Sequence, residues 1–380
     1  MSSHIDEELL TEILKRLPPK SLLKFRSVSK SWYSLITNPS FISIHTKHTT
    51  ISTPNSPKSL LRHYSWIHKQ EQYSIHGGIS TSSSSDNHLV FPFKSYSQYF
   101  EIIGSCNGLV CLSDSHRINS HTIILWNPAI RKSLILPSPS ITLNQIYMFV
   151  LGFGFDFKSS DYKVVRVVYR MRRNQIEIKP QVEVHALGIN SWRRIRITSP
   201  PRYVISELSL QVFLNGAVHW IGYNPSESDD FRDLSIVLFD MTREVFDEMR
   251  LPDSVCGLSV LDLCIFRSKE MLCLMQYSRN SRSQWIRYGS CSIWVMKEYG
   301  NVDSWSKNFT IDLQGGVGKA LGVRDDGEML VVMSSGDLAS YDIQSQEISH
   351  LGIKGIVNSF HMEDYFETLI LLDCFNGSYD

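Results

Sequence analysis

The apolar residues of this 380-residue chain follow two different periods, and the first of them is helical. In the first 45 residues, apolar side chains recur about every four positions, which is the spacing of one face of an α-helix. The proline pair at 18–19 ends the first predicted helix, because proline lacks a backbone donor and clashes with the preceding turn. The first stripe consists of Ile5, Leu9, Ile13 and Leu17, and further helical turns are expected over 21–26, 30–36 and 41–44.

A helical unit that spans only residues 1–45 buries a small part of its surface and is marginally stable alone. We therefore expect its apolar stripe to be shared with a partner protein. Residues 46–57 are expected to link this unit to the rest of the chain.

From about residue 58 onward the period changes to two. Short apolar runs such as 108–112 and 163–168 alternate with Gly, Asn, Asp and Ser, which is typical of β-strands joined by turns. The strands group in fours, in units of roughly 35–50 residues, and a four-stranded unit of this length is typical of a propeller blade. Five complete units are expected at 101–137, 151–197, 210–251, 261–311 and 320–353.

The strands left over at the two ends of this region predict a sixth blade. Runs near 60–66 and 72–76 precede the first unit, and the run 360–372 follows the last. A blade built from both ends closes the ring and removes exposed strand edges. The expected fold class is α+β, with a small helical domain at 1–45 and an all-β, six-bladed propeller at 58–380.

The charge balance argues against binding to nucleic acid or to a membrane surface. Lysine plus arginine equals aspartate plus glutamate at 38 each, so no global charge attracts such a partner. The acidic, polar first eight residues lack the order of a signal peptide, and the seven cysteines are expected to be buried, reduced thiols. These features favour the cytoplasm, the nucleus or both.

Motifs for catalysis are incomplete in this sequence. The stretch 315–320 is similar to a phosphate-binding loop, but Leu313 and Ala320 stand where Gly and Ser or Thr are required. The sequence has no Cys-x-x-Cys pair for zinc and no Gly-x-Ser-x-Gly elbow. His219 beside Trp220 is interpreted as a core histidine. We therefore expect no catalytic residues, no metal and no cofactor.

The predicted helical segment 6–42 resembles the F-box of plant F-box proteins, chiefly through the run ILKRLPPKSLLKFRSVSKSW that ends at Trp32. The remainder is similar to the F-box-associated, kelch-like propeller domain of one large plant family. Two positions depart from the F-box pattern, since His4-Ile5 replaces the usual Leu-Pro and Ser29 replaces a Cys, which puts the strength of the adaptor contact in question. The segments that carry the second likeness are GSCNGLVCL, WNPAIRK, FGFDFKSSDYKVVRV, LNGAVHW and FDMTREVFDEMRLP.

This resemblance implies a substrate-recognition subunit of an SCF-type (Skp adaptor–cullin–F-box) E3 ubiquitin ligase, which itself is not an enzyme. It implies that the F-box binds a Skp-type adaptor, which is bound to the cullin–RING scaffold. The propeller is then expected to bind a protein substrate, so far unknown, for ubiquitination and proteasomal degradation.

The resemblance also implies which F-box positions face the adaptor. Some of them must instead form the module's own core, and Leu17, Pro18, Leu22 and Val28 are favoured for the contact. A few apolar residues of this kind can anchor a partner, because a small number of central residues usually carries most of the binding energy. The matching positions are Ile5, Leu9, Ile13, Leu17, Pro18, Leu22, Leu23, Phe25, Val28 and Trp32.

Other functions remain open from the sequence. The same two-domain layout occurs in S-locus-like F-box proteins of pollen self-incompatibility. The propeller could also act as a binding module outside a ligase. A propeller enzyme or a sugar-binding propeller is the rival from another class, although the missing catalytic motifs and signal peptide argue against it.

Irregular loops of the predicted propeller form the candidate substrate-binding surface. Five of them, at 113–121, 170–179, 223–233, 277–288 and 334–337, are expected between the second and third strands of their blades, and therefore on one face. Loop charge is expected to set selectivity for the substrate. The candidate residues are the basic Arg170, Arg172, Arg173, Arg279 and Arg282 and the acidic Asp229 and Asp230.

Overall fold

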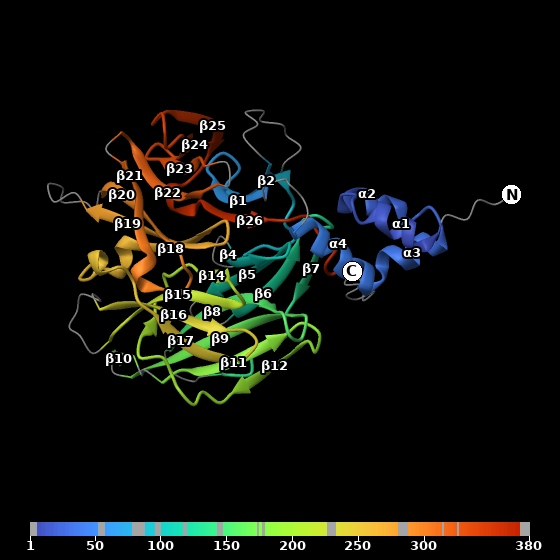
Figure 1. Cartoon of the computed structure of the whole chain (residues 1–380), viewed down its shortest axis with the longest axis horizontal. Helices are drawn as coiled ribbons and strands as arrows, with labels where there is room; N and C mark the ends of the chain where they lie inside the picture. The colour runs from blue at the N-terminus through green and yellow to red at the C-terminus, as the bar shows by residue number, and fades with distance from the viewer. Residues whose placement is uncertain are drawn as a thin grey trace.

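The computed structural model describes residues 6–51, 58–77, 88–95, 100–116, 120–142, 147–172, 175–176, 179–225, 233–279, 288–313, 315–324 and 327–372. Within these residues the chain forms four α-helices followed by six sheets of four or five strands. Figure 1 shows the sheets arranged around a common centre and the helices projecting from one side. The predicted fold class, a helical unit followed by a six-bladed propeller, is confirmed.

The helices begin where the sequence supplies suitable first residues. Pro19 is the first residue of α2, a position where its missing N–H costs no hydrogen bond. Ser29 caps α3, because its hydroxyl oxygen accepts a hydrogen bond of 3.2 Å from the backbone N–H of Trp32. The helices are α1 (Glu7–Leu14), α2 (Pro19–Phe25), α3 (Lys30–Thr37) and α4 (Pro39–Ile51).

The fourth helix is longer than the single turn expected from the sequence. It continues to Ile51, so the first half of the expected linker, 46–51, is helical. Threonine is a poor helix former, which is why the sequence pattern did not indicate this length. The hydroxyls of Thr46, Thr49 and Thr50 each donate to the backbone carbonyl four residues earlier, and Ile42 is buried in the core shared with the propeller.

Each blade is a set of antiparallel strands, numbered here as blades 1 to 6. Blade 1 contains β4 (Glu101–Cys106), β5 (Leu109–His116), β6 (Ser120–Asn127) and β7 (Lys132–Ile135). Blade 2 contains β8 (Tyr147–Asp156), β9 (Asp161–Arg172), β10 (Gln175–Ile176), β11 (Gln181–Ala186) and β12 (Ser191–Ile195). Blade 3 contains β13 (Val204–Ile205), β14 (Val212–Leu214), β15 (Ala217–Tyr223), β16 (Leu234–Asp240) and β17 (Val245–Met249).

The remaining blades complete the ring. Blade 4 contains β18 (Leu263–Ser268), β19 (Met271–Arg279), β20 (Tyr288–Met296) and β21 (Trp305–Asp312). Blade 5 contains β22 (Val317–Val323), β23 (Met329–Met333), β24 (Asp337–Tyr341) and β25 (Ile348–Lys354). Blade 6 contains β26 (His361–Tyr365), β1 (Lys58–Ser65), β2 (Gln70–His76) and β3 (His88–Leu89), so it is built from both ends of the propeller sequence as predicted.

Ring closure depends on the pairing of β26 with β1. Five residue pairs, from Lys58 with Tyr365 to Arg62 with His361, join the two strands in antiparallel register. The segment after Tyr365 is not a strand, although the apolar run 360–372 had suggested one. Its residues Leu369 to Leu372 are nevertheless buried, because the segment packs across blade 1.

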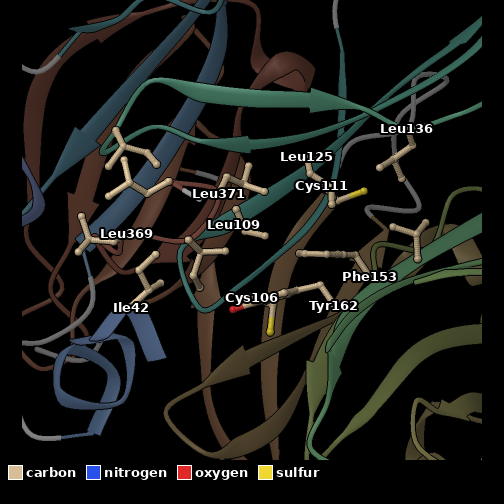
Figure 2. Close-up of a cluster of buried hydrophobic side chains, with 14 of the residues drawn as sticks. Ile42, Cys106, Leu109, Cys111, Leu125, Leu136, Phe153, Tyr162, Leu369 and Leu371 are labelled. Atoms are coloured by element: carbon tan, nitrogen blue, oxygen red, sulfur yellow. The ribbon is translucent and has the colours of Figure 1, made fainter. Parts of the chain in front are cut away.

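A single hydrophobic core connects the helices to the propeller. Ile42 of α4 is 6% exposed and belongs to the same buried cluster as Leu109 of blade 1 and Leu369 and Leu371 of the C-terminal segment. Figure 2 shows Ile42 lying among these side chains. The helical unit is therefore packed against the ring and is not connected to it through the linker alone.

The strand order gives the ring two distinct faces. The hairpins between the first and second strands of the blades lie on the face we call the helix face, because there they line a cavity together with α4. The opposite strand ends lie on the other face, which we call the loop face. Its described parts are the turns at 66–69 and 334–336 and the strand ends at His116, Arg172, Tyr223 and Arg279.

Candidate functional site

The helices leave several large apolar side chains in contact with solvent. Leu9 and Ile13 of α1 are 56% and 45% exposed, and Val28, which lies between α2 and α3, is 62% exposed. Pro18 is also exposed. A cluster of exposed apolar side chains on so small a unit is typical of a protein-binding surface.

The other F-box motif positions lie deeper. Leu17, Leu23, Phe25 and Trp32 are half-buried and pack against the core, and the rings of Phe25 and Trp32 meet edge to face at 5.6 Å. Leu22, which the motif placed among the favoured contacts, is completely buried and therefore belongs to the module's own core. Ile5 lies outside the described residues.

Ser29, one of the two departures from the F-box pattern, has the capping role that its place before the third predicted helix indicates. Its hydroxyl caps α3 and also lies 2.9 Å from the hydroxyl of Ser31. The usual cysteine would provide only a weak sulfur acceptor at this position. The serine therefore stabilises the start of α3, next to the exposed Val28.

The F-box has a further exposed aromatic residue, which is not among the predicted contact positions. Tyr33 is 43% exposed, and the guanidinium of Arg26 lies 4.6 Å from the centre of its ring. The position falls outside the four-residue stripe that guided the prediction. Since Tyr33 belongs to α3, it extends the exposed apolar surface beyond α1.

The described strands on either side of the five loops singled out in the sequence are the strands that the prediction paired, and their adjoining ends lie on one face. Parts of the first four loops lie outside the described residues, so a shared loop surface stays a prediction. Three of the candidate arginines nevertheless lie in strands, because β9 continues to Arg172 and β19 to Arg279. Arg170 in β9 is exposed near the loop face, where its guanidinium donates to the side-chain oxygen of Gln181 at 2.8 Å and 3.1 Å.

Other candidate charges are already engaged within the protein. The guanidinium of Arg279 donates to a carboxylate oxygen of Asp262 at 2.7 Å. Asp233, at the end of the acidic loop, accepts hydrogen bonds from the Tyr203 hydroxyl and the Asn224 amide. Arg173, Asp229, Asp230 and Arg282 lie outside the described residues, as does the side chain of Arg172.

The loop-face connection of blade 6 is not among the five loops predicted from the sequence. The turn between β1 and β2 exposes two large apolar side chains, with Trp66 at 66% and Ile67 at 79%. The available signal was an apolar pair in a turn, where polar residues are usual. It was overlooked because 60–66 was assigned entirely to a strand.

The helix face contains a cavity of about 1230 Å³, lined by α4 and by residues of all six blades. Its buried polar groups have partners within the protein. The Gln211 amide exchanges hydrogen bonds with the backbone of Phe153, and His361 is bonded to Glu363 at 2.9 Å. Nothing in the described lining indicates a bound ligand.

The histidine and lysine singled out in the sequence are structural. Burial lowers the pKa of His219 to about 4, and its Nδ1 lies 3.0 Å from the Val212 carbonyl oxygen, so Nδ1–H donates there. Nε2 then accepts from the Tyr299 hydroxyl at 2.7 Å. Lys319 lies in β22 and donates to the Phe360 carbonyl oxygen, which rules out a phosphate-binding loop at this position.

The thiols that the structure describes are unpaired by disulfides, and most are buried. Burial raises the pKa of Cys106 and Cys273 to about 12, so these thiols are unreactive. Cys256 is exposed, contrary to the expectation of burial for this set. Among the described residues, we find no group of His, Cys, Asp or Glu side chains arranged to hold a metal ion. None of the described helices is long and apolar enough for a membrane span.

Comparison with known proteins agrees with this geometry. A family model described as F-box domain matches residues 2–43, and one described as F-box associated beta propeller domain matches residues 67–373. The chain is 28% identical to F-box protein At3g07870 of Arabidopsis thaliana, over 97% of this chain and 92% of that protein. It is 28% identical to F-box/kelch-repeat protein At3g23880 of the same plant, over 96% and 94% of the two chains.

Likeness to solved structures is weak. The α-L-arabinanase of Penicillium chrysogenum has a TM-score of 0.39 and 9% identity, over 64% of this chain and 76% of that one, and it supports no argument about function. The family models together cover nearly all of the chain. The protein therefore belongs to the F-box proteins that carry an F-box-associated β-propeller domain.

Proposed function

We propose that this protein is the substrate-recognition subunit of an SCF-type E3 ubiquitin ligase, with no catalysis of its own. The F-box, the propeller and the similarity to plant F-box proteins support this role in general. In this proposal the F-box binds a Skp-type adaptor that joins it to the cullin–RING scaffold. The propeller binds a protein that is then ubiquitinated and degraded by the proteasome, in the cytoplasm or the nucleus.

The exposed apolar surface of the F-box carries the proposal. Leu9, Ile13 and Val28 remain exposed although α4 buries the other side of the helical unit against the propeller. Exposed aliphatic side chains of this size gain free energy when a partner covers them, at about 25 cal/mol per Å² of buried apolar area. We place Leu17, Pro18 and Trp32 at the edge of the same contact and assign Leu22 to the core.

Co-purification with a Skp-type adaptor tests the first step. The variant Val28→Asp should lose the adaptor, since it places a charge on the apolar contact without disturbing the core. Ile189→Asp is the matched control, because Ile189 is 72% exposed in blade 2 and is not part of the apolar F-box surface formed by Leu9, Ile13 and Val28. Equal adaptor binding by the wild type and by Val28→Asp would contradict the proposed contact.

Degradation is tested in cells with the same pair of variants. Proteins bound by the propeller should accumulate when Val28→Asp replaces the wild type and should still co-purify with the variant. Ile189→Asp should leave their abundance at the wild-type level. If the abundance and ubiquitination of the bound proteins are the same with Val28→Asp as with the wild type, the propeller is a binding module outside a ligase.

We place substrate capture on the loop face. It lies opposite the cavity that α4 lines, so a protein bound there does not collide with the helical unit. The candidate contacts are Arg170, Arg172, Arg173, Asp229, Asp230 and Arg282, and Arg279 contributes less because Asp262 already binds its guanidinium. The charge-reversed variant Arg170→Glu/Arg172→Glu should weaken capture of an acidic substrate.

A further inference from the structure

The turn between β1 and β2 is the most apolar described part of the loop face. Trp66 is 66% exposed, whereas the other tryptophans that the structure describes are buried or half-buried. Its neighbour Ile67 is 79% exposed. Tryptophan gains more than other residues from burial, and it is enriched among the few interface residues that dominate binding energy.

The hairpin holds these side chains in a fixed position. Seven residue pairs, from Ser59 with His76 to Ser65 with Gln70, join β1 and β2 without a break in register. The hydroxyl of the buried Ser65 accepts a hydrogen bond of 3.3 Å from the His68 N–H, and Lys69 closes the turn with a φ of 52°. A preorganised tip of this kind loses little conformational entropy when it binds.

The end of β1 next to the turn is anchored to the connection between blades 5 and 6. The Tyr64 N–H donates to the Ser359 hydroxyl at 2.8 Å, and the Ile356 N–H donates to the Tyr64 carbonyl oxygen at 3.2 Å. The ring of His63 stacks on that of Phe360 at 5.1 Å. Because this connection holds β1 and β2 is paired to β1 along its length, the exposed tip is not a loosely attached loop.

The charge next to the apolar pair specifies the kind of partner. His68 and Lys69 are exposed beside Trp66 and Ile67, and no acidic residue lies between Ser65 and Gln70. Glu71, the next acid along the chain, is turned into the blade with only 11% of its side chain exposed. The tip therefore presents an apolar surface with a basic rim.

We propose that the Trp66–Ile67 tip is an anchor for the protein substrate, inserting into an apolar pocket of the substrate that is rimmed by carboxylates. This inference rests on the proposed function and adds a substrate class and a site within the loop face. A membrane surface is the other partner that an exposed tryptophan can suit. It is disfavoured because the tip carries a single lysine and the chain has a net charge of zero.

Site-specific photo-crosslinking in cells tests the proposal with the full chain and its adaptor. A photoreactive amino acid replaces Ile67, or Arg170 elsewhere on the loop face, or Ile189 on the helix face. The captured protein is then produced recombinantly as the binding probe. Trp66→Ala should weaken its binding about tenfold or more, Lys69→Glu should weaken it in a salt-dependent way, and Phe157→Ala, on the helix face, should have no effect.

The other outcomes separate the two proposals. Crosslinks from position 170 but not from 67, or a Kd that is unchanged in Trp66→Ala, would overturn the anchor and leave substrate capture on the loop face standing. Crosslinks from position 189 alone would overturn both. Trp66-dependent binding to phosphatidylserine vesicles, without protein crosslinks from position 67, would identify the tip as a membrane contact and also overturn the anchor.

Discussion

Asn127 in blade 1 donates a hydrogen bond of 2.8 Å from its side-chain amide to the backbone carbonyl oxygen of Ile370, near the C-terminal end of the described chain. The same amide donates to the carbonyl oxygen of Thr368 at 3.0 Å. Asn127 is completely buried, and its own side-chain oxygen accepts from the Ala129 N–H. Asn127 therefore binds the segment that follows β26, the strand that closes the ring, to blade 1.

This relationship predicts a large loss of stability in Asn127→Ala. The substitution leaves the carbonyl oxygens of Thr368 and Ile370 without a partner in a buried site, where an unsatisfied group costs about 1–3 kcal/mol, while the Ala129 N–H keeps the Tyr365 hydroxyl as its acceptor. We expect the free energy of unfolding to fall by about 2–4 kcal/mol in urea denaturation. Asn358→Ala is the control, since Asn358 is exposed, and a similar loss in both variants would refute the role of Asn127.

A second prediction concerns the completely buried ion pair of Arg166 and Glu183, whose charged atoms lie 2.6 Å apart. Glu183 also accepts hydrogen bonds from the backbone N–H groups of Ser140 and Ile141, so it fixes the connection from blade 1 to blade 2. Arg166→Met leaves the carboxylate buried without its cation. We expect a loss of about 3–5 kcal/mol in the free energy of unfolding.

The double variant Arg166→Met/Glu183→Gln distinguishes the charge from the packing. Glutamine keeps an oxygen that accepts from Ser140 and Ile141 but carries no charge. The double variant should therefore regain more than half of the stability that Arg166→Met loses. If both variants are equally unstable, the cost arises from lost packing of the arginine side chain and not from an unpaired charge.

Glu71 predicts a pH dependence of stability. Burial in blade 6 raises the pKa of its carboxyl group from 4.5 to about 7. Between these values the unfolded chain releases a proton that the folded protein keeps, so this residue's contribution to stability falls as pH rises from about 4.5 to 7. The total change is roughly 3 kcal/mol at most.

The variant Glu71→Gln isolates this effect, because all other titrating groups are shared with the wild type. The amide oxygen of glutamine can still accept from the Phe100 N–H and the Tyr73 hydroxyl. The urea midpoint of the wild type should decrease relative to that of the variant as pH rises from 4.5 to 7, and the difference should stay constant above pH 8. Parallel curves over the whole range would show that Glu71 has an ordinary pKa.

The propeller could be predicted because its signals are local and repeated. Turn residues separate short apolar runs at a regular spacing, and the positive φ values at Asn107–Gly108 and Asn215–Gly216 occur where Asn-Gly pairs mark hairpins. Even the sixth blade followed from counting unpaired strands. For the F-box, the sequence predicted a stripe of apolar positions but not which of them are exposed, because the motif does not distinguish the buried Leu22 from the exposed Val28.

The failures have a common physical cause, which is long-range packing. The length of α4 depends on contacts with residues far along the chain, and Thr-rich sequence gives no local sign of them. From the sequence, Arg279 was expected to be a loop residue that contacts the substrate, but in the folded protein its guanidinium binds Asp262. Trp66 shows the converse, since an apolar side chain next to a strand was assumed to be buried and is exposed instead.

The contact between Ile42 and the C-terminal segment predicts a fixed position of the F-box relative to the loop face. Inter-domain contacts hold a fixed geometry when they are apolar and well buried, and Ile42, Leu369 and Leu371 are at most 6% exposed. Ile42→Asp places a charge in this contact from the helical side, and Leu371→Asp does so from the propeller side. Both variants should free the F-box from its fixed position against the propeller. Neither substitution changes the exposed Leu9 and Val28 that are proposed to bind the adaptor.

Distance measurements between spin labels at Lys20 and Lys307, each changed to Cys in a Cys256→Ser/Cys374→Ser background, check this prediction. The wild type should give one narrow distribution, and both Asp variants should broaden it while adaptor affinity stays within about twofold of the wild type. Agreement between the two variants excludes local unfolding of either domain as the cause, because they lie on opposite sides of the contact. A distribution that is already broad in the wild type would mean that the F-box moves freely, and the C-terminal segment would then serve ring closure alone.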